Sequence, residues 1–241
     1  MHYIQKGESP AFFEECKNNL PENANWDHFE ENQELGQCKQ ALKQHLLAEQ
    51  SSLCVYCERK IHLDTEQQDQ SGTRLSFKKS DCHFEHIMPK DSYPAIVFEY
   101  KNLSLSCNGD QCHPEQNKLF KPQDVHSCGH KKGKIFNEED FLNPVALLDI
   151  ADFFAYELTS CSIISSDKDK VRADKTIELL NLNNPRLNNE RHSARTAFIK
   201  VFETDIKNKN LNRIKAYLGK NPAFVSFLNY WLASSHTKLF D

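Results

Sequence analysis

The sequence contains no run of apolar residues that approaches the roughly 18 needed to cross a bilayer, so no membrane-spanning helix is expected. Its first ten residues, Met-His-Tyr-Ile-Gln-Lys-Gly-Glu-Ser-Pro, lack the apolar core of a secretory signal peptide. Internal repeats and long low-complexity tracts are absent as well. These absences predict a cytoplasmic protein that does not contact membranes. A chain of 241 residues is long enough to bury a core as one large or two small domains.

Nine cysteines are present, and an odd number argues against a framework in which every thiol is paired. In a reducing compartment cysteines stay as thiols, and clustered ones bind metal more often than they form disulfides. Cys16, Cys38 and Cys161 lie outside the main cluster in apolar patterns, so they are expected to be small core residues. The question of a metal site therefore concerns the remaining six.

The formal net charge is −4, from 30 basic and 34 acidic side chains, which is unfavourable for a nucleic-acid binder. This average conceals opposed regions. Residues 71–134 carry 10 basic and 7 acidic side chains (net +3), whereas residues 1–70 carry 6 and 13 (net −7). Residues 186–220 carry 9 and 3 (net +6) and residues 135–185 carry 4 and 10 (net −6). For the basic region 186–220 three roles are open: contact with nucleic acid, contact with a protein partner, or a solvated face. Its basic residues include Arg186, Arg191, Arg195, Lys200 and Arg213.

Helical spacing of apolar residues marks the N-terminal segment, and short runs fill the middle of the chain. A helix is expected from Pro10, capped by Ser9, and a second helix is expected to end near Gln50. Between residues 52 and 134 the pattern breaks into short runs typical of strands and turns, at 53–56, 75–77, 83–88 and 102–106. The most polar stretch, 64–71, is expected to be a loop.

Helices return in the C-terminal third. Asp167 is expected to cap a helix over 168–182 in which Val171, Ile177 and Leu180 face inward. Asn184-Pro185 is expected to open a longer helix that places Val201 in the core, and an apolar helix follows at 223–233. The sequence thus predicts an α+β protein, mainly α-helical, in which segments 1–50, 51–135 and 136–241 pack as one compact domain.

A C-x-x-C motif at Cys54 and Cys57 is the first element that carries chemistry. Two thiolates on a tight turn can bind one Zn²⁺ from the same side, and a second pair must then complete the tetrahedron. A redox-active C-x-x-C would need a βαβ context, which this sequence lacks, and a fortuitous pair is the remaining alternative. The candidates for the second pair are Cys107, Cys112 and Cys128, with His113 and His126 nearby and Cys82 expected to stay unliganded.

The dipeptide Glu85-His86 is the second element. A carboxylate can hold a divalent cation, and a neutral imidazole can remove a proton from an attacking water, so the pair suits phosphodiester hydrolysis. The two side chains diverge in a regular strand unless the strand ends there, and Pro89 favours such an end. His83 shares the strand face of Glu85 and could approach the metal, but a surface or hydrogen-bonding role is favoured.

The order of these motifs resembles that of HNH nucleases, in which a ββα-metal finger is held by a four-cysteine zinc site. The resemblance covers about residues 54–133. It implies that His86 is the general base, that Glu85 binds a catalytic Mg²⁺ or another divalent cation, and that Asn102 orients His86. It further implies that Lys131 or Lys132 lies near the phosphate on the helix.

A more specific resemblance, over roughly residues 50–195, is to the PtuB-type subunit of the Septu anti-phage system, which is also found beside some retrons. It favours pairing of Cys107 with Cys128, with His130 completing the catalytic metal site. In the alternative, Cys107 pairs with Cys112, and His113 or Asn117 takes the role of His130. Whether Cys112 or Cys128 is the fourth zinc ligand stays open at this point.

The same resemblance implies a bacterial defence effector that cleaves DNA or RNA, tRNA among the RNAs, together with a PtuA-like ATPase. In retron-linked cases it also implies a reverse transcriptase and its RNA–DNA hybrid as partners. Two rival classes remain. One is a zinc-stabilised adaptor or nucleic-acid-binding module with an inactive centre, and the other is a stand-alone HNH endonuclease. The net negative charge counts against the second, because autonomous binding usually rests on phosphate contacts from Lys and Arg.

Overall fold

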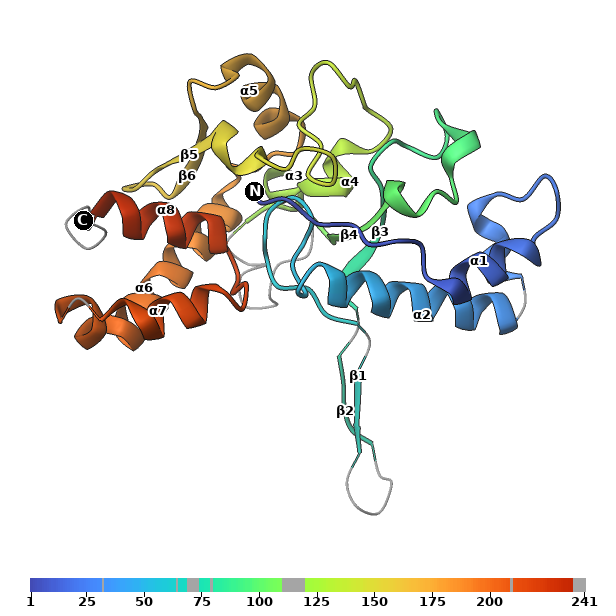
Figure 1. Cartoon of the computed structure of the whole chain (residues 1–241), viewed down its shortest axis with the longest axis horizontal. Coiled ribbons are helices and arrows are strands. Elements are labelled where there is room, and N and C mark those ends of the chain that lie inside the picture. Colours follow the sequence, from blue (N-terminus) through green and yellow to red (C-terminus); the bar gives the residue numbers. More distant parts are fainter. Residues whose placement is uncertain are drawn as a thin grey trace.

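The computed structural model describes residues 1–31, 33–63, 65–68, 74–78, 80–109, 120–208 and 210–235 (Figure 1). Helices dominate this part of the chain: α1 (Ala11–Asn18), α2 (Gln33–Glu49), α3 (Pro122–Val125), α4 (Cys128–Lys132), α5 (Lys170–Leu179), α6 (Pro185–Lys207), α7 (Leu211–Leu218) and α8 (Val225–Ser235). Short 3-10 helices occur at η1 (Trp26–Glu30), η2 (Pro94–Ile96), η3 (Tyr100–Asn102) and η4 (Ile150–Phe153). The expected α+β class, mainly helical, is confirmed.

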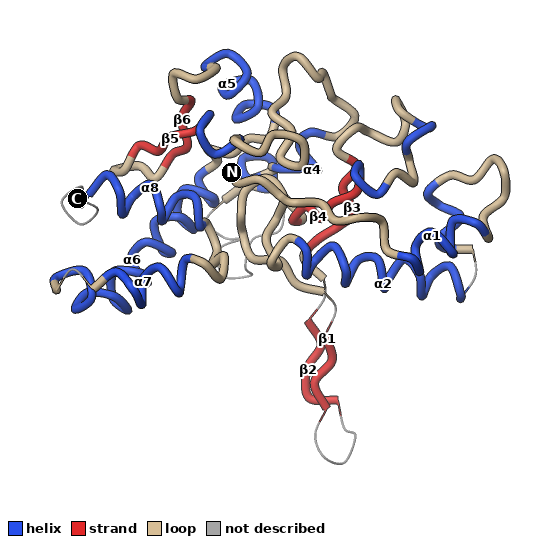
Figure 2. Tube along the Cα trace, viewed as in Figure 1, coloured by secondary structure: helices blue, strands red, loops and turns tan. Residues whose placement is uncertain are grey.

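The strands form separate antiparallel pairs rather than one sheet, as the colours of Figure 2 show. They are β1 (Thr65–Gln68) with β2 (Arg74–Lys78), β3 (Cys82–His86) with β4 (Leu103–Cys107), and β5 (Phe154–Glu157) with β6 (Ser162–Ser165). The β1–β2 pair extends away from the rest of the chain (Figure 1). The expectation of a loop over 64–71 was therefore wrong for β1, because backbone pairing with β2 outweighs the polar character of the segment.

Local capping signals fixed the helix starts to within a few residues. α6 begins at Pro185 after Asn184, whose side chain accepts a hydrogen bond from the amide of Leu187 at 3.1 Å, as expected. α5 begins later than expected, because Asp169 is the residue whose carboxylate accepts from the amide of Arg172 at 3.1 Å. The N-cap of α1 is Pro10 instead of Ser9.

Two residues expected in the core lie on the surface. Val171 is 64% exposed and Val201 is 54% exposed. In α5 the buried Ile177 follows Val171 by six residues, and six steps of about 100° place the two side chains about 120° apart around the helix. The inward face of α5 is instead set by Ala173, Thr176 and Ile177.

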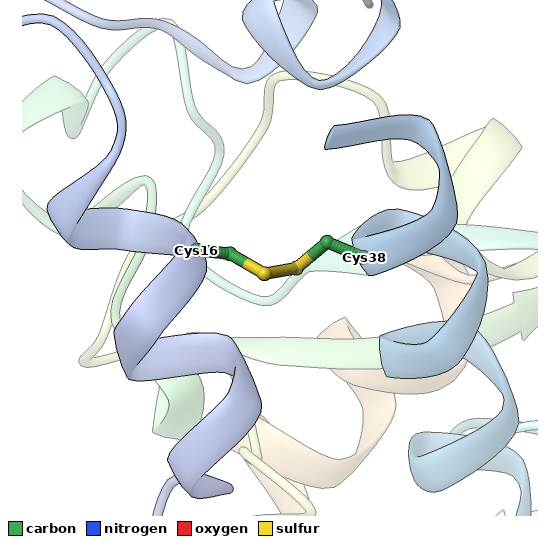
Figure 3. The surroundings of a disulfide bond; sticks show 2 residues. All are labelled: Cys16 and Cys38. Atoms are coloured by element: carbon green, nitrogen blue, oxygen red, sulfur yellow. A yellow bond between two sulfur atoms is a disulfide. The ribbon is translucent and has the colours of Figure 1, made fainter. Parts of the chain in front are cut away.

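Two of the three outlying cysteines form a disulfide bond. Cys16 of α1 and Cys38 of α2 are linked, with their Cα atoms 6.5 Å apart (Figure 3). This separation lies within the usual range for the bond. The expectation that both are reduced core thiols was wrong, because packing of α1 against α2 brings the two sulfur atoms together. Cys161 is a free, buried thiol, as expected.

One hydrophobic cluster contains buried residues from the N-terminal segment, the middle segment and the C-terminal helices. Glu58, which is 2% exposed, joins the middle of the chain to α8 through hydrogen bonds from the amide and the hydroxyl of Ser226, at 2.8 and 2.5 Å. Pairing of β3 with β4 sets Glu85 opposite Ser104 and His86 opposite Leu103. None of the helices in the described ranges is long and apolar enough to span a bilayer.

Candidate functional site

The C-x-x-C motif lies on a tight turn, as its zinc-binding interpretation requires. A single bridge between Leu53 and Lys60 closes the turn, and the amide of Glu58 donates to the carbonyl of Cys54 at 3.1 Å. Glu58 has a φ of 61°, in the left-handed region that reverses the chain direction. The turn directs both cysteines of the motif to one side, as zinc chemistry requires.

Four buried thiols meet at one point. Those of Cys54 and Cys57 come from the turn, that of Cys107 from the end of β4, and that of Cys128 from the start of α4. Their ligand atoms all lie within 4.8 Å of one another, and the sulfur atoms of Cys57 and Cys107 are 3.7 Å apart. The structure thus brings together the four cysteines that the family resemblance favoured. The alternative ligands Cys112, His113 and Asn117 lie outside the described residues.

The electrostatics of the four thiols fit a soft divalent cation. Burial opposes ionisation of Cys54, yet hydrogen bonds from the Cys107, Cys128 and Cys57 thiols hold its pKa well below its usual range. The pKa of Cys128 is raised well above its usual range by its hydrogen bonds to Cys107, Cys54 and Cys57 and by burial. One thiolate therefore suppresses ionisation of its neighbours. A tetrahedral Zn²⁺ would remove that conflict by binding all four as thiolates.

Two arginines lie close enough to this cluster to interact with its charge. Arg186 is 0% exposed and donates to the hydroxyl of Ser127 at 2.9 Å. Burial lowers the pKa of Arg186, but attraction to Cys107 and other acidic groups raises it overall, and the same cysteine raises the pKa of Arg59.

Arg191 is 3% exposed and donates to the carbonyls of Cys161 and Leu182. Arg186 and Arg191 therefore belong to none of the three surfaces left open for this basic region, because both guanidinium groups form hydrogen bonds inside the fold.

Glu85 is held in the interior by two partners. Its side chain is 6% exposed, and its Oε1 accepts from the Tyr56 hydroxyl at 2.8 Å and from the Lys132 ammonium at 2.9 Å. The ammonium of Lys132 also donates to the carbonyls of His86 and Ile87, both at 3.2 Å. Burial raises the pKa of Glu85, but hydrogen bonds and attraction from His83 and Lys132 lower it overall. Glu85 is therefore a carboxylate at neutral pH.

His86 lies beside Glu85 at the last position of β3. Its Nε2 is 3.0 Å from the carbonyl of Val97, and its ring meets Trp26 edge to face at a centroid distance of 4.7 Å. Burial lowers the pKa of His86 to about 4. In the neutral ring Nε2 donates to Val97, so Nδ1 carries the lone pair and can accept a proton.

Asn102 connects the two ends of the segment that follows β3. Its Oδ1 accepts from the amide of Met88 at 2.8 Å, and its Nδ2 donates to the carbonyls of Met88 at 3.0 Å and Ile96 at 3.3 Å. The side chain is buried, with an exposure of 4% for the residue. Ile96 precedes Val97, the acceptor for His86, so Asn102 contacts the segment that carries this acceptor.

The remaining predicted residues are on α4. His130 is exposed, and its ring stacks on that of His83 at a centroid distance of 4.1 Å and an angle of 12°. Lys131 is exposed, whereas Lys132 is 1% exposed and paired with Glu85. The expected position of Lys132 at a phosphate is not observed, because its ammonium points toward β3, where it meets Glu85 and the carbonyls of His86 and Ile87.

Sequence reasoning missed Tyr56 and the inward direction of Lys132 as partners of Glu85. Tyr56 is the second middle residue of the C-x-x-C motif, but spacing alone does not show that its hydroxyl reaches β3. His83 was expected to share the strand face of Glu85, and its Nε2 lies 3.6 Å from Oε2 of that residue. The signal for His83 was present in the two-residue spacing that places it on the same strand face as Glu85.

The fold and the site define an α+β protein in which a buried four-thiol cluster lies next to a Glu-His pair on a short hairpin. The chain is 31% identical over 242 residues to the Escherichia coli protein named "Retron Ec83 putative HNH endonuclease", with 89% of this chain and 85% of the relative covered. It is 26% identical over 180 residues to "Retron Vc95 putative HNH endonuclease" of Vibrio cholerae serotype O1 biovar El Tor, with 71% and 72% covered. No protein-family model matches the chain. The chain belongs to the family of retron HNH endonucleases, and it is accordingly a nuclease, a hydrolase of phosphodiester bonds.

Proposed function

We propose that the chain is a metal-dependent HNH nuclease of the PtuB type, the effector of an anti-phage defence complex. It cleaves phosphodiester bonds in DNA or RNA, tRNA included, together with a PtuA-like ATPase. A retron reverse transcriptase and its RNA–DNA hybrid are further proposed partners. The observation that supports this proposal best is the adjacency of Glu85 and His86 at the end of β3, beside a segment held by Asn102.

In this proposal His86 is the general base. Its Nε2 is committed to the carbonyl of Val97, so Nδ1 takes the proton of the attacking water. Asn102 keeps the acceptor segment in place and thereby sets the direction of the ring. Glu85 would hold a divalent cation, with His130 nearby. When bound, that cation supplies stabilisation of the charge that develops on the phosphate.

The four thiols of Cys54, Cys57, Cys107 and Cys128 are proposed to hold a structural Zn²⁺. They connect the turn before β1, the end of β4 and the start of α4. Binding of zinc would thus contribute directly to the free energy of folding of a ββα-metal finger.

Cleavage of defined substrates tests the assignment. The purified chain, with and without a PtuA-like ATPase, is incubated with plasmid DNA and with total tRNA in the presence and absence of Mg²⁺ or Mn²⁺. We expect metal-dependent cleavage that falls by at least about 100-fold in His86→Ala, the usual order for loss of a general base. His192→Ala, at an exposed histidine of α6, is the matched control and should keep full activity. Absence of cleavage in every combination would refute the nuclease mechanism proposed here.

A catalytically inactive, zinc-stabilised adaptor is the second candidate. One observation favours it, namely that the ammonium of Lys132 already binds one of the two oxygens of Glu85. The same assay decides between the two. An adaptor would bind nucleic acid without cleaving it, and His86→Ala would leave that binding unchanged.

A further inference from the structure

A ring nitrogen of His83 faces a carboxylate oxygen of Glu85. His83 Nε2 lies 3.6 Å from Glu85 Oε2, and both side chains leave the same face of β3 because they are two residues apart. The separation exceeds that of an ordinary N–H···O hydrogen bond, which is about 2.7–3.2 Å. The contact between the two groups is therefore a long one, which leaves room for a cation bound by both atoms.

The tautomer of the neutral His83 ring depends on its second neighbour, Asn108. His83 Nδ1 is 3.2 Å from Asn108 Oδ1, and Asn108 Nδ2 donates to the carbonyl of Ser80 at 3.5 Å. In this arrangement the oxygen of the Asn108 amide faces Nδ1. In the neutral ring the proton is then on Nδ1, and the lone pair of Nε2 points toward the carboxylate.

The carboxylate is arranged to leave one oxygen for this contact. Oε1 is occupied by Tyr56 and Lys132, whereas Oε2 faces His83. The space beside Oε2 depends on Gly129 of α4. A Cβ at that position would overlap Oε2 and would lie 2.8 Å from His83 Nε2, so any larger residue would close the space.

We propose that His83 is a second protein ligand, with Glu85 Oε2, of the divalent cation of the nuclease centre, and that this centre prefers a transition ion such as Mn²⁺ over Mg²⁺. The inference rests on the proposed function and adds a residue and a metal class to it. A cation about 2.1 Å from each atom, the usual ligand distance, would span a 3.6 Å separation at an angle of about 120°. An imidazole nitrogen is a better ligand for transition ions than for Mg²⁺, which prefers oxygen.

Access and rigidity support the assignment. The ring of His83 is held by the parallel ring of His130. It also lines a cavity of about 560 Å³ together with Lys39 and Lys43 of α2. Among the described residues that line this cavity there is no Asp or Glu. The ammonium of Lys39 is paired with Glu30 at 2.6 Å, and that of Lys43 donates to the hydroxyl of Ser80 and the carbonyl of Cys82, both at 2.9 Å. The remaining ligands of the proposed cation would be water and phosphate oxygens.

Binding of Mn²⁺ tests the proposal without any turnover. Zinc-loaded wild-type chain is titrated with Mn²⁺, and free Mn²⁺ is measured by electron paramagnetic resonance; competition with Mg²⁺ gives the relative affinity. We expect one Mn²⁺ per chain, bound more tightly than Mg²⁺. His83→Ala should weaken Mn²⁺ binding by about tenfold or more and should reduce the preference of the site for Mn²⁺ over Mg²⁺. His126→Ala, at a half-buried histidine of the same region, is the control and should bind as the wild type does. A zinc content of one per chain and an unchanged circular dichroism spectrum establish that each variant is folded.

Each outcome has a distinct meaning. If Glu85→Gln abolishes Mn²⁺ binding but His83→Ala leaves both affinity and preference unchanged, the role of His83 is refuted while the nuclease centre stands. Absence of Mn²⁺ binding to the wild type at millimolar concentration also refutes it. If binding depends on His83 but the cleavage assay is negative throughout, the cation site stands and the proposed nuclease function fails.

Discussion

The ammonium of Lys132 lies 2.9 Å from Oε1 of Glu85, and the two side chains are 1% and 6% exposed. The pair joins α4 to β3 next to the stacked rings of His83 and His130. Removal of two charges from water is costly, and here the cost is offset by further acceptors. The ammonium of Lys132 also donates to the carbonyls of His86 and Ile87, and the hydroxyl of Tyr56 donates to the carboxylate of Glu85.

Replacement of Lys132 by Met should therefore destabilise the fold. The substitution leaves the buried carboxylate of Glu85 without its cation, for which a loss of about 3–5 kcal/mol in the free energy of unfolding is expected. Denaturant titration of zinc-loaded protein measures the loss. Lys131→Met, at the exposed neighbour, is the control and should change stability by no more than about 0.5 kcal/mol. Equal stabilities of the two variants would show that the ion pair contributes nothing.

The metal content should separate Cys128 from Cys82. Both cysteines are buried, but only Cys128 belongs to the four-thiol cluster in the described part of the chain. We expect about one Zn²⁺ per chain in the wild type, as measured by atomic emission. Cys128→Ser should lose most of the zinc together with the cooperative thermal transition, since zinc binding and folding are coupled. Cys82→Ser should retain both, and loss of zinc in Cys82→Ser alone would contradict the ligand set.

Asn102→Ala should reduce cleavage far more than it reduces stability. The substitution removes the contacts to Met88 and Ile96 that hold the acceptor segment of His86. A shift of a base by about 1 Å can lower the rate by about 100-fold. Single-turnover rates measure the effect, with thermal melting as a check of folding. Asn229→Ala, at an exposed asparagine of α8, is the control. A proportional loss of rate and of folded protein would instead assign Asn102 a purely structural role.

The disulfide between Cys16 and Cys38 should be detectable by peptide mapping under non-reducing conditions. It closes a sequence separation of 22 residues, for which a stabilisation of about 3 kcal/mol is expected. A reductant that leaves zinc in place should therefore lower the melting temperature of the wild type but not of the Cys16→Ala/Cys38→Ala double variant. Recovery of both peptides with free thiols from untreated protein would contradict the link.

Much of the candidate site could be predicted because its motifs are short. Cys54 and Cys57 are close in sequence, Glu85 and His86 are neighbours, and the start of α6 at Asn184-Pro185 depends on a local cap. Each of these features involves interactions over a few residues, which spacing and residue type determine directly. The disulfide of Cys16 could not be predicted, since it requires the relative placement of two helices.

The direction of long side chains could not be predicted for the same reason. Lys132 is one of two consecutive lysines on α4, and nothing in the sequence distinguishes the exposed one from the buried one. Arg186 and Arg191 belong to a strongly basic segment, yet both are buried and donate hydrogen bonds to groups inside the fold. A count of charges records how many cations a segment has but not which of them meet solvent.

The sequence by itself determined the chemical inventory: a pair of thiols on one turn, a carboxylate next to an imidazole, an asparagine at the start of the returning strand, and helices on both sides. Only the tertiary structure decided that Cys107 and Cys128 join the first two thiols, that Lys132 binds Glu85, and that His83 faces the free oxygen of that carboxylate. The physical reason is the range of the interactions. Caps, turns and strand alternation act over a few residues, whereas the four-thiol cluster and the buried ion pair depend on how segments distant in sequence pack around one core.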